Sequence, residues 1–599
     1  MGDEFKISIK RSDIVKLKSL FNPSILMIIL FIISSLLYLN IDKLPLTHPG
    51  NLKASDPFGH TIIANDIIVT EQWNYIGQMF SLGKLNEANP QPPLLYLNSA
   101  ILSIFSGLPT WVTMYFLVCI SQAFFVIVIY LITKEVFENN KTAILAAFLS
   151  ILPLPISIWL YPLYVGMWIQ VAAYFFLLAG IWLFIKYLKT KNNTILFLYG
   201  LVIGALILIH PTDIMLLFIP SLILGVDTIF ESIKKKDLVF LIKKGLIVTS
   251  LPLIAFISMA SRFLFVWRWH SSADQYKPGF YGLNNYFNIV KDNPVLQRVL
   301  PPFNQIPISQ IVLFLIGFVL LCVSIYMPYK LFVQNNKIKG KKISIKPKLI
   351  WVIFTTYYFV FVYFAEVFLY QPYYIGRMRN LQPFIIYPTL AFFVISLIKS
   401  ILLGIELSIK KNLKYKKIIS YTLLILFMIS FVFVTKSIVE YKNTVEIGKR
   451  EFLSLHEYQA YQWLQQNSEP DETLLFFGGI SQNEQLYSNR PHGVITLDEY
   501  QKLLTVQMEQ NITQTNLTLQ GWGGSTTRTN IIELGFMKYK EVDEPGNNVN
   551  IQDFDYIFFQ DLDETLTHVN DLFAYQYITK LGFTYVYDQN GYSILKNSK

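Results

Sequence analysis

The stretch PSILMIILFIISSLLYLN, residues 23–40, contains no charged side chain and is long enough to cross the hydrocarbon core of a bilayer. Only 15% of the 599 residues are charged and 53% are hydrophobic, whereas about 25% are charged in a typical soluble protein. Similar apolar runs follow and predict an all-α polytopic membrane domain of about 11 transmembrane helices. The predicted spans are 23–41, 111–132, 142–160, 166–188, 195–210, 213–229, 245–266, 309–330, 349–370, 380–403 and 418–436.

Basic loops predict how these spans are oriented. The basic segments fall on alternate sides of the spans, all on the side of the N-terminus, which the positive-inside rule assigns to the cytoplasm. They lie at 5–18, 133–141, 186–193, 231–244, 337–348 and 409–417. The long loops 42–110 and 267–308 then face outward. We expect an integral plasma-membrane protein with a cytoplasmic N-terminus and an extracytoplasmic C-terminal region.

The segment PPLLYLNSAILSIFSGLP, residues 92–109, is apolar but short and is bounded by proline and glycine. Counting it as a span would place every later lysine cluster outside the cell. It is therefore predicted as an interfacial or re-entrant helix on the outer face. A true span with a compensating change elsewhere is the alternative.

The chain from 437 onward reads as a small extracytoplasmic α/β domain, 437–599, after the membrane domain 1–436. EYQAYQWLQQNSEPDETLLFFGG (457–479) predicts an amphipathic helix, a turn and a buried strand, LDEYQKLLTVQM (497–508) predicts another helix, and Gln589–Asn590–Gly591 predicts a hairpin turn. The net charge of +10 combines a basic excess before 437 with an acidic excess after it. Since the basic groups lie in short loops between spans, nucleic acid is excluded as a partner.

The outer segment KASDPFGHTIIANDIIVTEQW, residues 53–73, carries the first candidate site residues. A carboxylate between hydrocarbon and water is partly desolvated and is a good proton acceptor, so Asp56 is the candidate general base. His60, one helical turn later, is taken as its catalytic neighbour. Asp56 followed by proline also fits a helix N-cap, and both roles can hold. Asp66 and Glu71 are supporting candidates, with a solvated helix face as the favoured alternative.

Metal-ligand spacings are lacking in this segment. Asp56 and His60 are too few to hold a metal ion, and no HExxH or CxxC pattern occurs. No cofactor is predicted, and a divalent metal is the disfavoured alternative.

The order of motifs resembles the GT-C superfamily of polytopic glycosyltransferases, which includes protein O-mannosyltransferases and aminoarabinose transferases. DPFGH (56–60) leads to NPQPPLLYLNSAILSIFSGL (89–108), and later to AILAAFLSILPLPISIWLYPLYVGMW (143–168) and LYGLVIGALILIHPTDIMLLFIPSLIL (198–224). The resemblance, over roughly residues 20–400, implies an acidic catalytic residue in the first outer loop, which is Asp56 here. It also implies a polyprenyl-phosphate sugar donor. The chain departs from the pattern by lacking a paired Asp-Glu in that loop and a WWDYG signature.

Cations for the donor phosphate are predicted near the outer ends of later spans. Arg377 and Arg379 follow an aromatic-rich loop, and Arg268 lies in an aromatic segment that is either a lid or an interfacial belt. The alternative for the two late arginines is snorkelling to lipid phosphates. Glu366 is a candidate because ionisable groups inside spans are expensive.

The segment IHPTD, residues 209–213, places His210 and Asp213 at the outer tip of two predicted spans. A structural turn in which Asp213 caps the next helix is the favoured reading. A contribution of both side chains to the polar pocket is the alternative.

Together these features predict an inverting membrane glycosyltransferase acting on the extracytoplasmic face. Its expected partners are a polyprenyl-phosphate-linked sugar, a glycan, lipid or protein acceptor, and the bilayer. The alternatives are a transporter or flippase of a lipid-linked or anionic substrate, and a non-catalytic scaffold of GT-C type.

Overall fold

The computed structural model describes the backbone of most helices and of the C-terminal strands. The described residues are 23–40, 55–71, 92–151, 167–272, 308–334, 345–368, 378–409, 419, 422–429, 455–469, 471–477, 492–495, 516–518, 532–534, 537–539, 548–560, 578–589 and 591–598. The candidate Arg377 and the predicted helix at 497–508 lie outside them.

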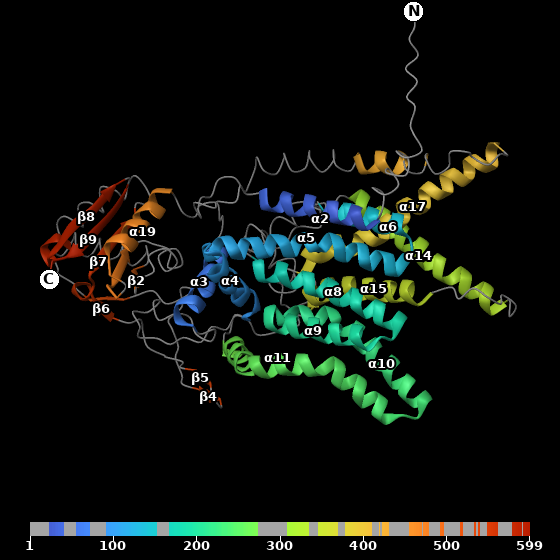
Figure 1. Ribbon diagram of the computed structural model, residues 1–599, viewed down its shortest axis with the longest axis horizontal. Helices are drawn as coiled ribbons and strands as arrows, with labels where there is room; N and C mark the ends of the chain where they lie inside the picture. The colour runs from blue at the N-terminus through green and yellow to red at the C-terminus, as the bar shows by residue number, and fades with distance from the viewer. Residues whose placement is uncertain are drawn as a thin grey trace, which may run out of the picture.

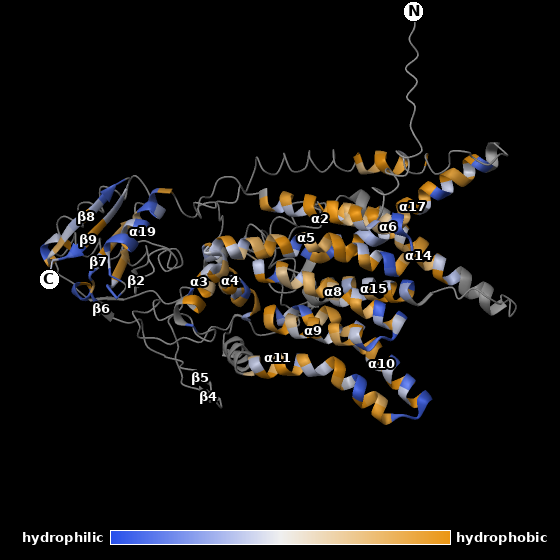
Figure 2. Ribbon diagram, viewed as in Figure 1, coloured by the Kyte–Doolittle hydropathy of each residue, from blue (hydrophilic) through white to orange (hydrophobic). Residues whose placement is uncertain are grey.

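A bundle of helices forms the first part of the chain (Figure 1). Most of its long helices run side by side, and their residues are predominantly apolar (Figure 2). The helices are α2 (Pro23–Asn40), α3 (Ser55–Thr70), α4 (Leu94–Ser106), α5 (Thr110–Phe137), α6 (Asn140–Ile151), α8 (Trp168–Thr190), α9 (Asn193–Ile209), α10 (Phe218–Lys235), α11 (Leu238–Ser272), α14 (Ile308–Gln334), α15 (Ile345–Phe368) and α17 (Gln382–Ile409). Two 3-10 helices, η3 (Pro211–Leu217) and η6 (Met378–Leu381), precede α10 and α17.

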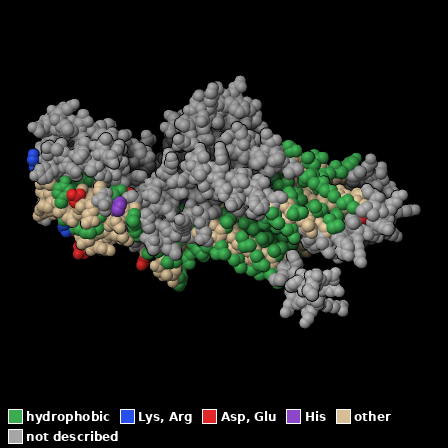
Figure 3. Space-filling view, turned by 90° about the horizontal axis from the view of Figure 1, so that it is seen from above, with side chains coloured by type: hydrophobic (Ala, Val, Ile, Leu, Met, Phe, Trp, Pro, Cys, Tyr) green, Lys and Arg blue, Asp and Glu red, His purple; other side chains and the backbone are tan. Residues whose placement is uncertain are grey.

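The bundle is a membrane domain. Within the described residues, five helical segments are long and apolar enough to cross a membrane. Large apolar side chains such as Phe230, Ile254 and Val319 are exposed on its outside, and hydrophobic side chains cover much of the described bundle surface that is visible in Figure 3. Because such a surface is costly in water but favourable in lipid, the protein is an integral membrane protein.

Helices occur at every predicted span from 23–41 to 380–403, and the last one has a described helical stretch at 422–429. The segment 92–109, predicted as interfacial or re-entrant, contains α4, which has 13 residues and is capped by Gly107 with φ 69°. A helix of that length is about 20 Å long, against about 30 Å for the hydrocarbon core. The short α4 therefore agrees with the expectation of a segment that does not span.

Basic helix ends gather at one end of the bundle. Lys189, at the end of α8, lies 3.1 Å from Glu135 and 2.9 Å from Glu138 at the end of α5. Lys191 is paired with Asp227 of α10. We call this the lysine-rich end. Helices α5 and α8 begin at the opposite end of the bundle, where α4 also lies (Figure 1).

Close backbone contact holds α9 against α11. A Cβ atom on Gly200 would lie 2.6 Å from the carbonyl oxygen of Val248, so glycine is required for this approach. Lys244 of α11 donates to the side chain of Asn193 at 2.6 Å, which sets the same end of both helices side by side. The two helices therefore run in the same direction, away from the lysine-rich end.

A five-stranded sheet forms the C-terminal part, with strand order β2-β1-β7-β9-β8. β1 (Leu474–Phe477) pairs in parallel with β2 (His492–Ile495) and β7 (Tyr556–Gln560), while β9 (Tyr592–Asn597) is antiparallel to β7 and β8 (Phe583–Gln589). Helix α19 (Leu455–Asn467) packs Tyr461 on Phe558, with ring centroids 5.2 Å apart. The predicted helix, strand and hairpin are thus confirmed at α19, β1 and β8–β9. The remaining described elements are β3 (Asn516–Thr518), β4 (Ile532–Leu534), β5 (Met537–Tyr539), β6 (Asn548–Asn550), η8 (Ile551–Asp553) and η10 (Thr579–Leu581).

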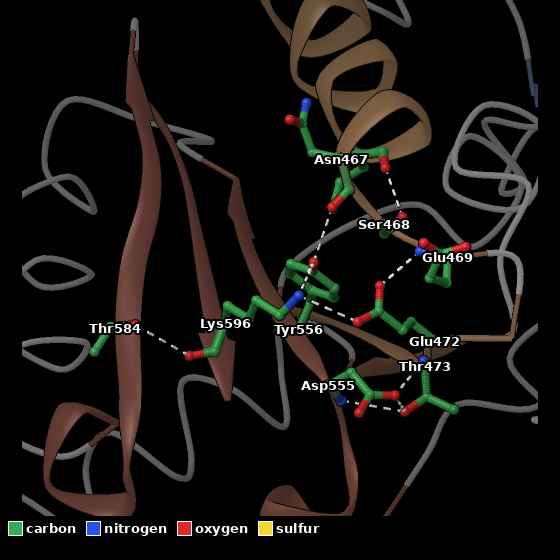
Figure 4. A network of polar contacts seen from close by, with 10 residues as sticks. Asn467, Ser468, Glu469, Glu472, Thr473, Asp555, Tyr556, Thr584 and Lys596 are labelled. Atoms are coloured by element: carbon green, nitrogen blue, oxygen red, sulfur yellow. Dashed lines mark hydrogen bonds and ion pairs between the residues drawn. The ribbon is translucent and has the colours of Figure 1, made fainter. Parts of the chain in front are cut away.

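A polar network joins the segment between α19 and β1 to strands β7 and β9 (Figure 4). Asp555, just before β7, accepts hydrogen bonds from the backbone N–H and hydroxyl of Thr473 at 2.7 and 2.9 Å. Lys596 donates to the hydroxyl of Tyr556 at 2.7 Å and lies 3.2 Å from Glu472. The hydrogen bond to Tyr556 and the Glu472 carboxylate raise the pKa of Lys596, although partial burial opposes this.

One aromatic contact joins the sheet part to the bundle. Tyr458 of α19 lies edge-on to Trp111 in the first turn of α5, with ring centroids 6.4 Å apart. The sheet part accordingly lies beyond the end of the bundle that is opposite the lysine-rich end (Figure 1).

Candidate active site

Helix α3 carries the first two candidate residues. Asp56 and His60 are four residues apart within Ser55–Thr70, so they lie on one face of the helix. Thr61, Ile62, Ile63 and Ala64 are buried and anchor the helix on the bundle. Of these two residues, only His60 has side-chain contacts that the structure describes; the side chain of Asp56 is not described.

His60 is held by aromatic residues from three other segments of the chain. Its Nδ1 atom lies 3.0 Å from the hydroxyl of Tyr96 in α4. Its ring lies 6.4 Å, centroid to centroid, from that of Trp168, the first residue of α8. Trp168 in turn packs edge-on against Tyr115 of α5 at 5.9 Å. The cluster thus joins α3, α4, α5 and α8.

The aromatic residues form a rigid base under the histidine. Tyr96 is 0% exposed and Trp168 is 1% exposed, whereas His60 is only half-buried. A buried hydrogen-bonded neighbour restricts both the rotamer and the tautomer of an imidazole. His60 is therefore the member of the cluster that can meet a ligand, hold its orientation and exchange a proton.

A second polar pair lies where α9 ends. His210 Nδ1 is 3.2 Å from Asp213 Oδ2 and 3.0 Å from the hydroxyl of Thr212. Asp213 is fully buried, and neither of its oxygens has a hydrogen bond of good geometry to any described residue. The two observations agree if the imidazole is at ion-pair distance but misaligned for a hydrogen bond. The expectation that Asp213 caps the next helix is wrong: Asp213 lies in the first turn of η3, and the N-cap positions of η3 and α10 are His210 and Leu217.

The 3-10 helix η3 carries Asp213 into the bundle. A Cβ atom on Gly180 of α8 would lie 3.1 Å from the Leu217 side chain, and the hydroxyl of Tyr357 in α15 donates to the carbonyl of Met215 at 2.5 Å. η3 is therefore packed between α8 and α15. Since α9 starts at the lysine-rich end, His210 lies at the opposite end, the same end as His60.

The remaining candidates are placed by their backbones. Glu366 lies near the end of α15, Arg268 near the end of α11, and Arg379 within η6. The start of α17 faces the middle of α5, because Phe384 packs on Phe125 at 4.9 Å and Phe392 on Phe137 at 4.8 Å. These three backbones thus lie toward the end opposite the lysines. Nothing is described of their side chains.

Asp66 and Glu71 differ from the two leading residues of their helix. Asp66 belongs to α3, and its side chain is not described. Glu71 follows the helix, is exposed and has φ 56°, which agrees with the solvated alternative. No group of three or more His, Cys, Asp or Glu residues that could hold a metal occurs in the described part of the chain.

Sequence pattern alone does not indicate Tyr96 as the partner of His60 or Gln170 as a buried polar residue. Gln170 lies two residues after Trp168, is 2% exposed, and makes no hydrogen bond from either amide atom to the described residues. A glutamine within an apolar run is a signal that could have identified it, because burying an amide is costly.

Comparisons with known proteins gave similarities among solved structures. No protein-family model and no curated protein matches the chain. The apo oligosaccharyltransferase from Archaeoglobus fulgidus is 12% identical over 97% of this chain and 75% of that chain, with a TM-score of 0.48. ArnT from Cupriavidus metallidurans bound to undecaprenyl phosphate is 10% identical over 96% and 97%, with a TM-score of 0.45. Apo ArnT is 11% identical over 95% and 97%, with a TM-score of 0.49.

These structures are GT-C polytopic membrane glycosyltransferases, the class that the sequence resembles. The function is inferred from the residues of the chain itself.

Proposed function

We propose that the protein is a membrane glycosyltransferase of GT-C type. It transfers a sugar from a polyprenyl-phosphate donor to a glycan, lipid or protein acceptor on the extracytoplasmic face. The observation that carries the proposal is the shared location of its polar candidates. His60, on the same helix face as Asp56, and the His210–Asp213 pair lie at the end of an apolar bundle that is opposite the lysine-rich ends.

Sidedness follows from the lysines. The positive-inside rule assigns the lysine-rich end to the cytoplasm, so the candidate site opens to the outside, where a lipid-linked donor enters from the outer leaflet. A site at this depth is bordered by lipid on one side and water on the other. That position suits a donor with an isoprenoid tail and a polar head.

The proposed reaction is a single displacement. The acceptor oxygen attacks the anomeric carbon, the bond from that carbon to the phosphate oxygen breaks, and polyprenyl phosphate leaves with inversion. Asp56 takes the proton of the acceptor as general base, and His60, fixed by Tyr96, orients the acceptor beside it. Arg377, Arg379 and Arg268 bind the phosphate and neutralise the charge that develops on it.

Transfer of label from a panel of radiolabelled polyprenyl-phosphate sugars to membrane-extracted acceptors tests the proposal. Asp56→Asn is expected to lower the transfer rate at least about a hundredfold, the usual range for a lost general base. Glu138→Gln makes the same chemical change at the lysine-rich end and serves as the matched control. If Asp56→Asn folds and transfers at the wild-type rate, Asp56 is not the base; if no sugar is transferred by the wild type, the activity is wrong.

A further inference from the structure

Asp213 is a buried carboxylate at the start of a candidate membrane span. It is fully buried and belongs to the candidate span Pro211–Lys235. Neither oxygen has a hydrogen bond of good geometry to the described residues, and the nearest cationic group is the imidazole of His210 at 3.2 Å. An ionisable side chain in this position is expensive and marks a functional site by default.

The charge on the imidazole of His210 decides whether the pair is neutral. A carboxylate beside a neutral imidazole would leave one uncompensated charge in the apolar interior, at a cost of several kcal/mol. A carboxylate beside an imidazolium is neutral as a pair.

The geometry determines which nitrogen of His210 meets a ligand. Nδ1 is the atom near both the Asp213 carboxylate and the Thr212 hydroxyl. The imidazole is partly exposed, with 16% of its side chain accessible, while Asp213 has 0%. In the imidazolium form, Nε2–H is the donor available to an anion, and Asp213 acts only through the histidine.

A neighbouring helix supplies a second buried polar side chain without a partner. η3 packs against α8, and Gln170, in the first turn of α8, has an amide that bonds to no described residue. Gln170 and Asp213 are thus two buried polar side chains without a described hydrogen bond at the same end of the bundle, and such groups are candidates for contact with a ligand.

We propose that His210, as an imidazolium oriented by Asp213, binds the phosphate of an isoprenoid lipid at the outer end of α9. The inference rests on the proposed function for the class of lipid, and it adds a phosphate ligand and a positioning residue that are separate from the three arginines. Asp213 is the positioning residue because it touches the imidazole and not the lipid.

Native mass spectrometry of the full-length protein in detergent tests this proposal. Undecaprenyl phosphate and undecaprenol compete for the protein, and the ratio of the two bound forms reports recognition of the phosphate alone. The wild type should prefer the phosphate. His210→Gln and Asp213→Asn should each reduce that preference about tenfold to a hundredfold, the effect of one charge-assisted hydrogen bond.

The double variant separates a coupled pair from general damage. If Asp213 acts through His210, the double variant should lose no more than about threefold beyond His210→Gln alone. Undecaprenol binding should stay unchanged, which shows that the variants fold. Thr355→Val is the matched control, because Thr355 is also buried without a described hydrogen bond but lies in α15.

Each of the other possible results refutes one named part of the proposal. Single variants that keep the wild-type preference, or that lose both lipids equally, refute the role of the His210–Asp213 pair. Additive losses in the double variant refute the positioning role of Asp213. Displacement of the lipid phosphate by excess inorganic phosphate alone would identify a free anion as the ligand. A wild type that binds both lipids equally would instead refute the proposed donor class.

Discussion

The Nδ1 atom of His60 lies 3.0 Å from the hydroxyl oxygen of Tyr96, although 36 residues separate the two in the sequence. This contact joins α3, which carries Asp56, to the short helix α4. Because Tyr96 is fully buried, it holds the imidazole from the protein side. The contact makes the first outer segment and α4 parts of one candidate site.

Replacing Tyr96 by phenylalanine should lower the transfer rate about three- to tenfold, because His60 loses a hydrogen bond of roughly 1 kcal/mol. Tyr115→Phe is the matched control. Its hydroxyl donates to the carbonyl of Tyr38 at 3.2 Å, whereas that of Tyr96 lies at the imidazole of His60. Transfer assays and melting temperatures of both variants provide the measurement. Equal losses of activity in the two variants would show that only stability is affected.

Much of the helical architecture could be predicted from the sequence because apolar runs and lysine-rich loops act over single segments. Span positions, the short α4, and the grouping of the lysines follow from hydropathy and charge alone. The strand LLFF and the turn ending at Gly591, with φ 83°, were also predictable from local pattern.

The site was less predictable because its contacts join distant segments. Sequence pattern selects His60 and Asp213 as unusual residues but does not indicate that Tyr96 supports the first or that His210 is the sole described ion-pair partner of the second. Tyr96 and Trp168 look like ordinary interfacial aromatics until packing brings them to His60. Tertiary packing, which local pattern does not encode, decides these pairings.

Gly200→Ala should destabilise the bundle. The new methyl group would lie 2.6 Å from the backbone oxygen of Val248, which cannot move away by changing a rotamer, so α9 and α11 must separate. We expect a loss of about 1–3 kcal/mol, the usual cost of overpacking. Gly225→Ala is the control, because a Cβ atom there meets nothing within 4 Å. Thermal unfolding in detergent should show a lower melting temperature for Gly200→Ala alone.

Asp555→Ala should loosen the attachment of β1 to β7. It removes the acceptor of the Thr473 N–H and hydroxyl, leaving a partly buried N–H group without its partner (Figure 4). The expected cost is about 1–3 kcal/mol, seen as faster hydrogen exchange in a peptide covering 471–477. Asp553→Ala changes an exposed carboxylate two residues earlier. Unaltered exchange in Asp555→Ala would mean that the strand pairing alone holds this edge.

The contribution of Lys596 to stability should depend on pH in the alkaline range. The Tyr556 hydroxyl and then Glu472 raise the pKa of Lys596 above its usual value. A raised folded-state pKa means that the stabilisation is fully present below about pH 10.4, the unfolded value, and is lost as the pH rises through the folded-state pKa. Because the side chain is 44% exposed, we expect a contribution below about 1 kcal/mol.

Lys596→Met provides the measurement of this pH dependence. Its melting temperature should lie below that of the wild type at pH 8, and the difference should shrink as the pH is raised beyond 10.4. Lys580→Met is the matched control, because Lys580 is exposed and has no ion pair among the described contacts. Its difference from the wild type should stay constant with pH. A Lys596→Met difference that is equally constant would mean that the lysine stabilises the sheet by apolar packing of its stem on the Tyr556 ring, which lies 4.8 Å from the ammonium.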